Sequence, residues 1–415
     1  MPPVSVAAEA AEPAAPGGLA GAGLMPLALL YVLSAVACCV LAARGRADFT
    51  DLHVYRLGGD AVLHGTSLYG FRYFRLAFTY TPFTALIFAP IAALPWVVPA
   101  TLLTVATALV VPVMLYLALR LPPASSWLSP AGAWRLALAA GAAAIWLEPI
   151  RTTLGYGQID VFIAAGILYD LTRPDGTRHK GIAIGLAAAF KLTPAIFVIY
   201  LLLARRYRAA LTATITFLVT VAAGFAVLPR TSAHFWDITF LNPQRVSPVQ
   251  NTENQSLFGA LARTLHTQHV TAEWLPLAVV VAVAGLALAA CAQRRGDEAL
   301  GFSLCALTGL LISPISWTHH WVIVIPALLL AAVRLYQSDT GNRWVRMLGM
   351  AAIAVVAVIG WARLAREIPG TDWLNLSARG ILYSELYVLA GLAALIIAAC
   401  SAGTRHLPAR AVRPR

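Results

Sequence analysis

The chain has 415 residues, of which 60% are hydrophobic and only 12% are charged. An ordinary water-soluble domain is closer to half apolar, so this composition excludes one and favours a protein that lies in a lipid bilayer. The formal net charge is +12, but arginines at the ends of apolar segments are typical of loops on the cytoplasmic side of a membrane. We therefore expect membrane lipids around the protein and no nucleic acid as a partner.

Three parts are expected along the chain. Residues 1–23 are rich in Ala, Pro and Gly and contain no Lys or Arg, so they predict a disordered tail rather than a signal peptide. Residues 24–403 hold repeated apolar stretches of about 20 residues, the length that crosses a bilayer core. Residues 404–415 form a basic tail, expected in the cytoplasm. The pattern predicts an all-α polytopic membrane protein with about 10–12 transmembrane helices.

The expected crossings follow one another with short basic or polar links. A proline-rich segment, Thr81–Leu119, is long enough for one or two of them. Alternation of the basic loops places residues 229–273, 313–320 and 366–384 on the side away from the cytoplasm. The other clear apolar stretches are Met25–Ala43, Leu136–Ile150, Ala209–Leu228, Leu275–Ala292, Leu300–Ile315, Val322–Val333, Met347–Ala362 and Leu386–Cys400.

One stretch breaks the alternation. Gly181–Ala204 is long enough for a single crossing, yet basic loops flank both of its ends. Lys191 and Pro194 lie in its middle, and a proline interrupts a helix because it lacks the amide hydrogen. We expect a broken hairpin whose two half-helices meet in the membrane at Lys191, an arrangement that is tolerated where it lines a cavity. A single kinked crossing is the alternative.

Two carboxylates, Asp48 and Asp51, follow the first apolar stretch. A carboxylate that is ionised near neutral pH can accept a proton from an attacking hydroxyl group. We expect Asp51 to do so and Asp48 to orient it, although the two could exchange roles. The alternative is that both are solvated loop acids or partners of a nearby arginine.

Several cations lie where the positive-inside rule does not expect them. An ionised Lys191 at bilayer depth needs a counter-ion or a cavity, and a phosphate is a natural anion for it. Arg151 and Arg245 fall in the expected external loops, and arginine binds phosphate through two parallel hydrogen bonds. His319 and His320 are expected to donate hydrogen bonds to a phosphate or a sugar; the alternative is an interfacial aromatic belt in which the histidines are incidental. We expect no metal, since no third anchored ligand accompanies the two histidines.

Five motifs together resemble a known family. In chain order they are residues 51–55 after the first span, Gly157–Gln158, Phe190–Pro194 followed by the arginines at 205, 206 and 208, Asn254–Leu257, and Ser313–Trp321. Their order over residues 44–340 resembles glycosyltransferase family 87, whose members are integral-membrane mannosyltransferases of the C superfamily. No nucleotide-binding loop accompanies them.

The resemblance implies a polyprenyl-phosphate-mannose donor and a glycolipid acceptor, namely a phosphatidylinositol mannoside or lipomannan. It implies an α-1,2 linkage made by inversion at the periplasmic face of a bacterial plasma membrane, with no cofactor. The family's catalytic acid falls on Asp51, with Asp48 as a rival. Its histidine falls on His319 or His320, which with Lys191, Arg245 and Arg151 are expected at the donor phosphate. The residues expected to bind the acceptor or its sugars are His53, Tyr55, Gln158, Asn254 and Gln255.

Two other functions stay open at this point. A polyprenyl-phosphate-arabinose-dependent arabinofuranosyltransferase would need the same charges at the lipid phosphate. A lipid or sugar transporter or flippase would also use an intramembrane charge and a broken helix. The long external polar segments, residues 44–81 and 229–273, favour an enzyme. The acceptor, its linkage and the oligomeric state are not fixed by the sequence.

Overall fold

A computed structural model describes residues 23–44, 48–74, 76–240, 248–338, 347–355 and 372–404. Apart from Gly23 and Thr404, the expected N-terminal and C-terminal tails lie outside the described residues, as do Arg245 and residues 356–362 of the expected crossing Met347–Ala362.

The first half of the fold contains α1 (Leu24–Arg44), α2 (Thr50–His64), β1 (Arg72–Tyr73), β2 (Leu76–Ala77), α3 (Pro82–Ala92), α4 (Val97–Leu119), α5 (Ala124–Trp127), α6 (Pro130–Ala144), α7 (Glu148–Tyr156), α8 (Asp160–Thr172), α9 (Ile182–Phe190), η1 (Thr193–Ala195) and α10 (Ile196–Leu203). The second half contains α11 (Tyr207–Val227), α12 (Pro229–His234), η2 (Phe235–Thr239), α13 (Leu257–Thr264), α14 (Thr271–Arg294), α15 (Glu298–Ile312), η4 (Thr318–Ile323), α16 (Val324–Gln337), α18 (Ala378–Ser384) and α19 (Leu386–Thr404). The two short strands pair in an antiparallel hairpin.

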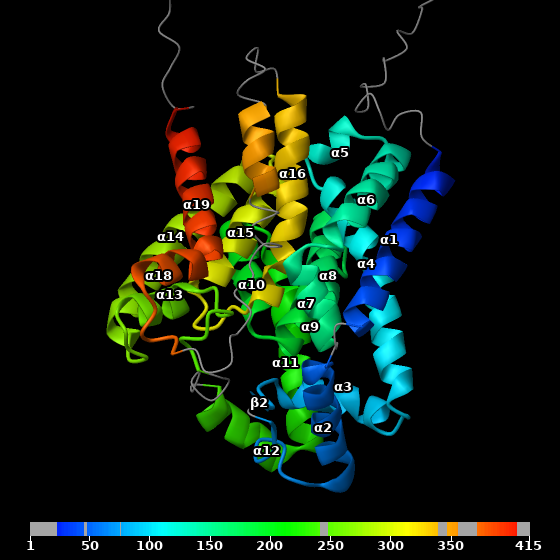
Figure 1. Cartoon of the computed structure of the whole chain (residues 1–415), viewed down its shortest axis with the longest axis vertical. Coiled ribbons are helices and arrows are strands. Elements are labelled where there is room, and N and C mark those ends of the chain that lie inside the picture. The colour runs from blue at the N-terminus through cyan, green and yellow to red at the C-terminus, as the bar shows by residue number, and fades with distance from the viewer. Residues whose placement is uncertain are drawn as a thin grey trace, which may run out of the picture.

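The protein is an all-α multi-pass membrane protein, as the composition predicts (Figure 1). Five helices of the described residues are long and apolar enough to cross a bilayer, or up to seven if each bent helix pair counts as one crossing. Three further apolar helices, α3, Thr193–Leu203 and α15, are shorter. The described residues therefore hold fewer full-length crossings than the 10–12 expected. Some of the expected crossings are helices too short to span a bilayer alone as straight helices.

One of the expected crossings is divided by a bend, and another directly follows one. The stretch Leu136–Ile150 is divided between α6 and α7, whose axes differ by 74°. Pro149 lies in the first turn of α7 and Glu148 begins that turn, both typical of a helix start. The expected crossing Leu386–Cys400 lies in α19. The axis of α18, which precedes it, differs from that of α19 by 64°. The bends bring polar helix ends into the fold instead of leaving them at its surface.

The break at Lys191 is confirmed. Helix α9 ends at Phe190, and Lys191 has extended backbone angles before η1 begins. A Cβ at Gly181 would lie 2.2 Å from the carbonyl oxygen of Ala209, so α9 starts beside the start of α11. Helix α10 ends only four residues before α11 begins. Both half-helices therefore meet the same end of the bundle, and Lys191 lies at the inner tip of a hairpin.

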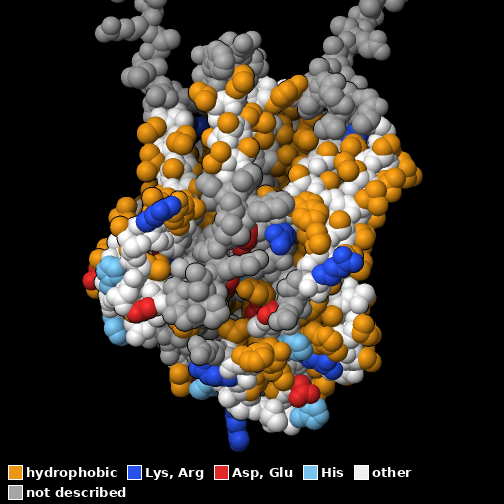
Figure 2. All heavy atoms as spheres, in the orientation of Figure 1, with side chains coloured by type: hydrophobic (Ala, Val, Ile, Leu, Met, Phe, Trp, Pro, Cys, Tyr) orange, Lys and Arg blue, Asp and Glu red, His pale blue; other side chains and the backbone are white. Residues whose placement is uncertain are grey.

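The surface divides into an apolar body and a polar end. Large apolar side chains of α1, α11 and α14 are exposed along the helices, as expected for faces in contact with lipid. Figure 2 shows hydrophobic side chains over the upper part of one face, while most of the charged and histidine side chains lie in its middle and lower parts. The lower part is where α2 and α12 lie (Figure 1).

A buried ion pair ties the loop before α13 to the C-terminal helices. The Arg263 side chain is fully buried and donates to both carboxylate oxygens of Glu385, at 2.5 and 2.7 Å. It also donates to the carbonyl oxygens of Asn251 at 2.7 Å and Asn254 at 3.0 Å. Arginine's planar group suits this paired geometry. One side chain thus fixes residues 250–254 against α18.

We expect Glu385→Gln to destabilise the protein by about 3–5 kcal/mol, because it leaves Arg263 charged, buried and without its carboxylate. The measurement is thermal unfolding of the purified protein in detergent. Asp60→Asn is the control, because Asp60 and His64 form an exposed pair and their separation should change stability by less than about 0.5 kcal/mol. Equal unfolding temperatures for Glu385→Gln and wild type would contradict the role given to this pair.

Candidate active site

The start of α2 packs tightly on the end of α7. The backbone N–H of Phe49, which has φ 48°, donates to the carbonyl oxygen of Gly155 at 2.9 Å. Gly157 ends α7 at φ +68°, and a Cβ there would lie 2.7 Å from the Cβ of Leu52. Only glycine satisfies both the positive φ and this close approach. The contact brings Asp51, in the first turn of α2, next to the residue that follows Gly157.

Gln158, the residue after Gly157, hydrogen-bonds several side chains of the site. Its Oε1 accepts hydrogen bonds from the hydroxyl of Tyr55 at 2.6 Å and from Nζ of Lys191 at 3.0 Å. Its Nε2 donates to the hydroxyl of Tyr80 at 3.2 Å, and its side chain also hydrogen-bonds Asp51. The amide is 2% exposed and its donors and acceptor are all used. Gln158 therefore connects the carboxylate of α2 with the lysine of the broken hairpin.

Lys191 has a buried counter-ion. Its Nζ lies 2.7 Å from Oδ1 of Asp160, which begins α8 and is buried. The ammonium also lies 5.8 Å from the ring centre of Tyr80, a cation–π distance. The sequence analysis did not select Asp160. The signal that could have found it is the demand of an intramembrane lysine for a carboxylate, together with an acid at the head of an otherwise apolar helix.

The predicted histidine pair lies beside this ion pair. His319 and His320 belong to η4, with ring centres 4.8 Å apart. Nε2 of His319 is 3.9 Å from Oδ2 of Asp160. Both ring nitrogens of His319 and Oδ2 of Asp160 are buried, with no hydrogen-bond partner among the described residues. Buried polar atoms without partners are costly, so a cluster of them points to a place where polar atoms of a ligand bind.

Asp160, His319 and His320 lie close enough together to hold a metal ion. Ligand atoms of Asp160, His319 and His320 all lie within 4.8 Å of one another, so Asp160 supplies the third ligand that the sequence analysis did not find. The nitrogen and oxygen donors suit a zinc-type ion. However, the ammonium of Lys191 already lies 2.7 Å from Asp160, and a divalent cation at the same carboxylate would be repelled by it.

The two N-terminal acids differ in their surroundings. Asp48 is exposed, and its Oδ1 accepts the backbone N–H of Thr50, the first residue of α2, at 3.2 Å. Asp51 lies outside the membrane-spanning helices, and burial raises its pKa to about 6, while the Gln158 hydrogen bond and the Lys191 charge oppose that rise. At neutral pH Asp51 is thus mostly ionised yet close to its pKa, as suits a general base. The geometry favours Asp51 over Asp48.

His53 and Tyr55 do not face the site in the same way. His53 stacks between two aromatic rings, with centroid distances of 3.8 Å to Trp96 and 4.8 Å to Tyr73. Burial, and then the charge of Arg56, lowers the pKa of His53, so the imidazole is neutral. His53 is two positions after Asp51, a rotation of about 200° that turns it to the other side of α2. Tyr55 is fully buried against Gln158.

Asn254 and Gln255 are occupied by the main chain. The amide of Asn254 donates to the carbonyl oxygen of Val249 and accepts the N–H of Ser316, both at 2.9 Å. Gln255 donates to the carbonyl oxygen of Ser384 at 2.6 Å. Both side chains are 0% exposed. The structure therefore uses these amides to hold the loop before α13 on the strand-like segment at 316–317, and it does not present them to a sugar.

Arg151 is exposed on α7 and lies near Cys38 of α1, and Arg245 lies outside the described residues. Besides Asp160 and Tyr80, Tyr156 and Glu253 also lie at the site, and the sequence analysis selected neither of them. Tyr156 packs edge-on against His319, with ring centres 5.8 Å apart, and its hydroxyl donates to Glu253 at 3.2 Å.

Comparisons with known proteins identify the family. The description "Glycosyltransferase family 87" matches residues 78–314, more than half of the chain. Together with the relatives below, the match shows that the chain belongs to glycosyltransferase family 87, as the five motifs indicate. No solved structure matches it significantly.

The relatives are mycobacterial enzymes. A polyprenol-phosphate-mannose-dependent alpha-(1-2)-phosphatidylinositol mannoside mannosyltransferase of Mycobacterium tuberculosis (H37Rv) is 31% identical, over 92% of this chain and 93% of its own length. A pentamannoside mannosyltransferase of M. tuberculosis (CDC 1551), also described as alpha-(1-2) and polyprenol-phosphate-mannose-dependent, is 34% identical over 83% of this chain and 78% of its own length. A mannoside mannosyltransferase of Mycolicibacterium smegmatis is 33% identical over 86% and 88%.

Proposed function

We propose that this protein transfers mannose from polyprenyl-phosphate-mannose to a mannose hydroxyl of a glycolipid, either a phosphatidylinositol mannoside or lipomannan, and forms an α-1,2 linkage. The observation that carries the proposal is that Gln158 hydrogen-bonds both Asp51 and Lys191. A carboxylate with a pKa of about 6 and a buried ammonium therefore belong to one hydrogen-bonded group. The names of the relatives, which all specify this donor and linkage, support the choice of substrates.

The reaction is a single displacement. Asp51 accepts the proton of the acceptor's 2-hydroxyl as that oxygen attacks the anomeric carbon of the donor. The bond from this carbon to the phosphate oxygen breaks, and the electron pair leaves with the polyprenyl phosphate. Because one displacement inverts the carbon, a β-linked donor gives an α-linked product. Phosphate leaves as a stable anion, so the mechanism asks for one base and no separate strong acid.

Lys191 stabilises the charge that develops on the phosphate. A preorganised cation in a water-poor site lowers the barrier more than the same cation would in water. Asp160 holds the ammonium at 2.7 Å, and the partnerless ring nitrogens of His319 are suited to hydrogen-bond a phosphate oxygen. Arg245 and Arg151 remain predicted phosphate contacts on sequence grounds. Asn254 and Gln255 support the site through the loop they brace rather than through sugar contacts.

The site faces the periplasm in this proposal. Ion pairs of Arg206 with Asp175 at 3.0 Å and with Glu298 at 2.5 Å gather the loops after α8, before α11 and before α15 at one end of the bundle. That end is rich in arginine, as cytoplasmic ends are. Lys191 lies at the inner tip of the hairpin that enters from this end, and Asp51 lies beyond it on α2. An arabinose donor and a transport role have no specific observation in their favour.

Asp51→Asn is expected to lower mannose transfer about 10²–10⁴-fold, because the amide cannot accept the proton. The assay follows labelled mannose from polyprenyl-phosphate-mannose into phosphatidylinositol mannosides with purified protein in detergent. Asp48→Asn is the matched control and should keep activity within a few-fold, since the amide oxygen of Asn can still accept the N–H of Thr50. Normal turnover by Asp51→Asn, or loss only in Asp48→Asn, would overturn the assignment of the base.

The pH dependence follows from the raised pKa of Asp51. The base must be ionised, so kcat/KM should be level above about pH 7 and fall as the pH drops through about 6. Below that value the fall should approach tenfold per pH unit. A pH–rate profile measured with donor and acceptor well below their KM values checks this limb, and residual activity of Asp51→Asn should lack it. A fall in kcat/KM near pH 4 instead would mean that the Asp51 carboxylate is not buried as described.

Metal independence is part of the proposal, because Lys191 supplies the positive charge at Asp160. Incubation with EDTA followed by desalting should leave the initial rate of mannose transfer unchanged. Addition of Mg²⁺, Mn²⁺ or Zn²⁺ should not raise it. If chelation abolished transfer and one of these ions restored it, the cluster of Asp160, His319 and His320 would have to be assigned as a metal site.

A further inference from the structure

The break at Lys191 takes the usual helical partners from two carbonyl groups at the end of α9. In a continuous helix the carbonyl oxygen of Ala189 would accept the N–H of Thr193. The carbonyl oxygen of Phe190 would accept the N–H of residue 194, but that residue is a proline and has none. The extended angles of Lys191 end the helix before either bond can form. Carbonyl groups at such a buried helix end need other donors.

Two threonines at the start of α3 supply those donors. The hydroxyl of Thr81 donates to the carbonyl oxygen of Ala189 at 2.5 Å. The hydroxyl oxygen of Thr84 lies 3.5 Å from the same carbonyl oxygen and 3.4 Å from that of Phe190. The two hydroxyl oxygens are 3.2 Å apart, and both side chains are buried. The threonines therefore cap the end of α9 from a helix that lies more than 100 residues earlier in the chain.

The sequence around these threonines fixes them in place. Thr81 is the N-cap of α3, its side chain accepts the N–H of Thr84, and a proline follows it at the first helical position. The residue before it is Tyr80, whose ring centre lies 5.8 Å from Nζ of Lys191. This short segment thus contacts both the backbone that precedes Lys191 and the ammonium group itself.

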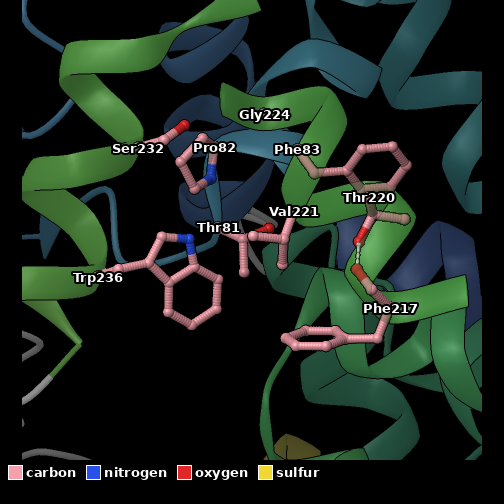
Figure 3. Close-up of a pocket in the computed structure, with 9 residues that line it drawn as sticks. All are labelled: Thr81, Pro82, Phe83, Phe217, Thr220, Val221, Gly224, Ser232 and Trp236. Carbon is pink, nitrogen blue, oxygen red and sulfur yellow. Dashed lines mark hydrogen bonds between the residues drawn. The ribbon is translucent and has the colours of Figure 1, made fainter. Parts of the chain in front are cut away.

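A small cavity lies behind Thr81, between α3, α11, α12 and η2. Figure 3 shows Thr81, Val221 and Trp236 on its lining. The cavity encloses about 10 Å³, roughly the space that one water molecule needs. Thr220 lines the same cavity, and its hydroxyl donates at 2.6 Å to the carbonyl oxygen of Phe217 in its own helix (Figure 3). Thr81 thus bonds the broken hairpin, whereas Thr220 bonds the helix to which it belongs.

We propose that Thr81 and Thr84 are positioning residues for the transfer reaction, because their hydroxyl groups fix the point at which Lys191 leaves the helix. From that point its Nζ lies 2.7 Å from Oδ1 of Asp160 and 3.0 Å from Oε1 of Gln158. Without a hydroxyl donor a buried carbonyl oxygen stays unpaired, which is costly. The end of α9 relieves that cost by shifting toward another donor and takes Lys191 with it. The effect on catalysis rests on the proposed function, whereas the effect on the place of Lys191 does not.

The first experiment measures mannose transfer by purified variants in detergent. Thr81→Val removes the hydroxyl but keeps the shape of the side chain, so no space opens for a water that could replace the donor. We expect kcat to fall about 10–100-fold, because small displacements of a group that acts in the transition state have effects of this size. KM for the acceptor should stay within about twofold, since Lys191 acts on the leaving phosphate. Thr84→Val should lower kcat less, about 3–10-fold, because its hydrogen bonds are longer.

Two further variants serve as controls. Thr81→Ser restores a hydroxyl donor at the same position and should keep kcat within about threefold of wild type. Thr220→Val removes a buried hydroxyl from the same cavity, and it should change kcat and KM by no more than about twofold, because that hydroxyl bonds only within its own helix turn. The unfolding temperatures of all variants are measured beside the rates.

A second experiment follows Lys191 without the reaction. The chain contains two lysines, Lys180 and Lys191, so mass spectrometry can follow their reductive methylation by formaldehyde and a borane separately. In wild type the side chain of Lys191 is 11% exposed and paired with Asp160, so it should react slowly. We expect its rate to rise at least about fivefold in Thr81→Val, because an unpaired carbonyl oxygen favours a displaced tip by about this factor or more. Lys180, which pairs with Asp175 at 2.7 Å before α9 begins, is the internal reference and should stay within about twofold.

The outcomes distinguish this inference from the proposed function. If wild type transfers mannose and Thr81→Val matches it in both kcat and the rate at Lys191, the proposed function stands and the inference fails. A fall in kcat with an unchanged rate at Lys191, or with equal rises at both lysines, would also overturn the inference. If the rate at Lys191 rises selectively but wild type transfers no mannose from polyprenyl-phosphate-mannose, the positioning of Lys191 stands and the proposed function fails.

Discussion

The contact between Lys191 and Asp160 is the constraint on which the rest of the site depends. A lone ammonium or carboxylate inside a helical bundle costs several kcal/mol, whereas a close pair with further hydrogen bonds recovers most of that cost. The pair forms because α9 stops at Phe190 and the extended backbone of Lys191 turns its side chain toward the head of α8. With the hairpin unbroken, no buried cation would lie near Gln158, and the carboxylate of α2 would have no electrostatic partner across the site.

Backbone packing places the other half of the site. The positive φ of Gly157 and its approach to Leu52 set α2 on α7 in one register, which directs Asp51 toward Gln158. On the opposite side, the buried side chains of Arg263, Asn254 and Gln255 hold the loop before α13 and the segment before η4 in place. The histidines of η4 thereby stay beside Asp160. The site thus consists of charges held on short helices and braced loops, while the long apolar helices supply the membrane anchor.

The sequence predicted those parts of the site in which a charged or helix-breaking residue lies within an apolar stretch. A lysine and a proline within an apolar stretch have few structural solutions, and the broken hairpin is the one found. Asp160 was missed because its pairing with Lys191 depends on how α8 and the hairpin approach each other, which spacing along the chain does not encode. For Asn254 and Gln255, the amide group suits a sugar and a backbone carbonyl equally well, and only the fold shows that the backbone takes both. The bend between α6 and α7 likewise follows from local helix-start signals that hydropathy averages away.

The central claim is that Asp51 and the Lys191 group act on opposite sides of one anomeric carbon, so that the acceptor oxygen displaces the lipid phosphate directly. The most direct test is the configuration of the new linkage. Purified protein is given a β-linked polyprenyl-phosphate-mannose labelled with ¹³C at the anomeric carbon, and the one-bond carbon–hydrogen coupling of the product is measured by NMR. The account predicts an α-mannoside as the sole product. A β-mannoside would require two displacements or a different leaving-group geometry, and would contradict it.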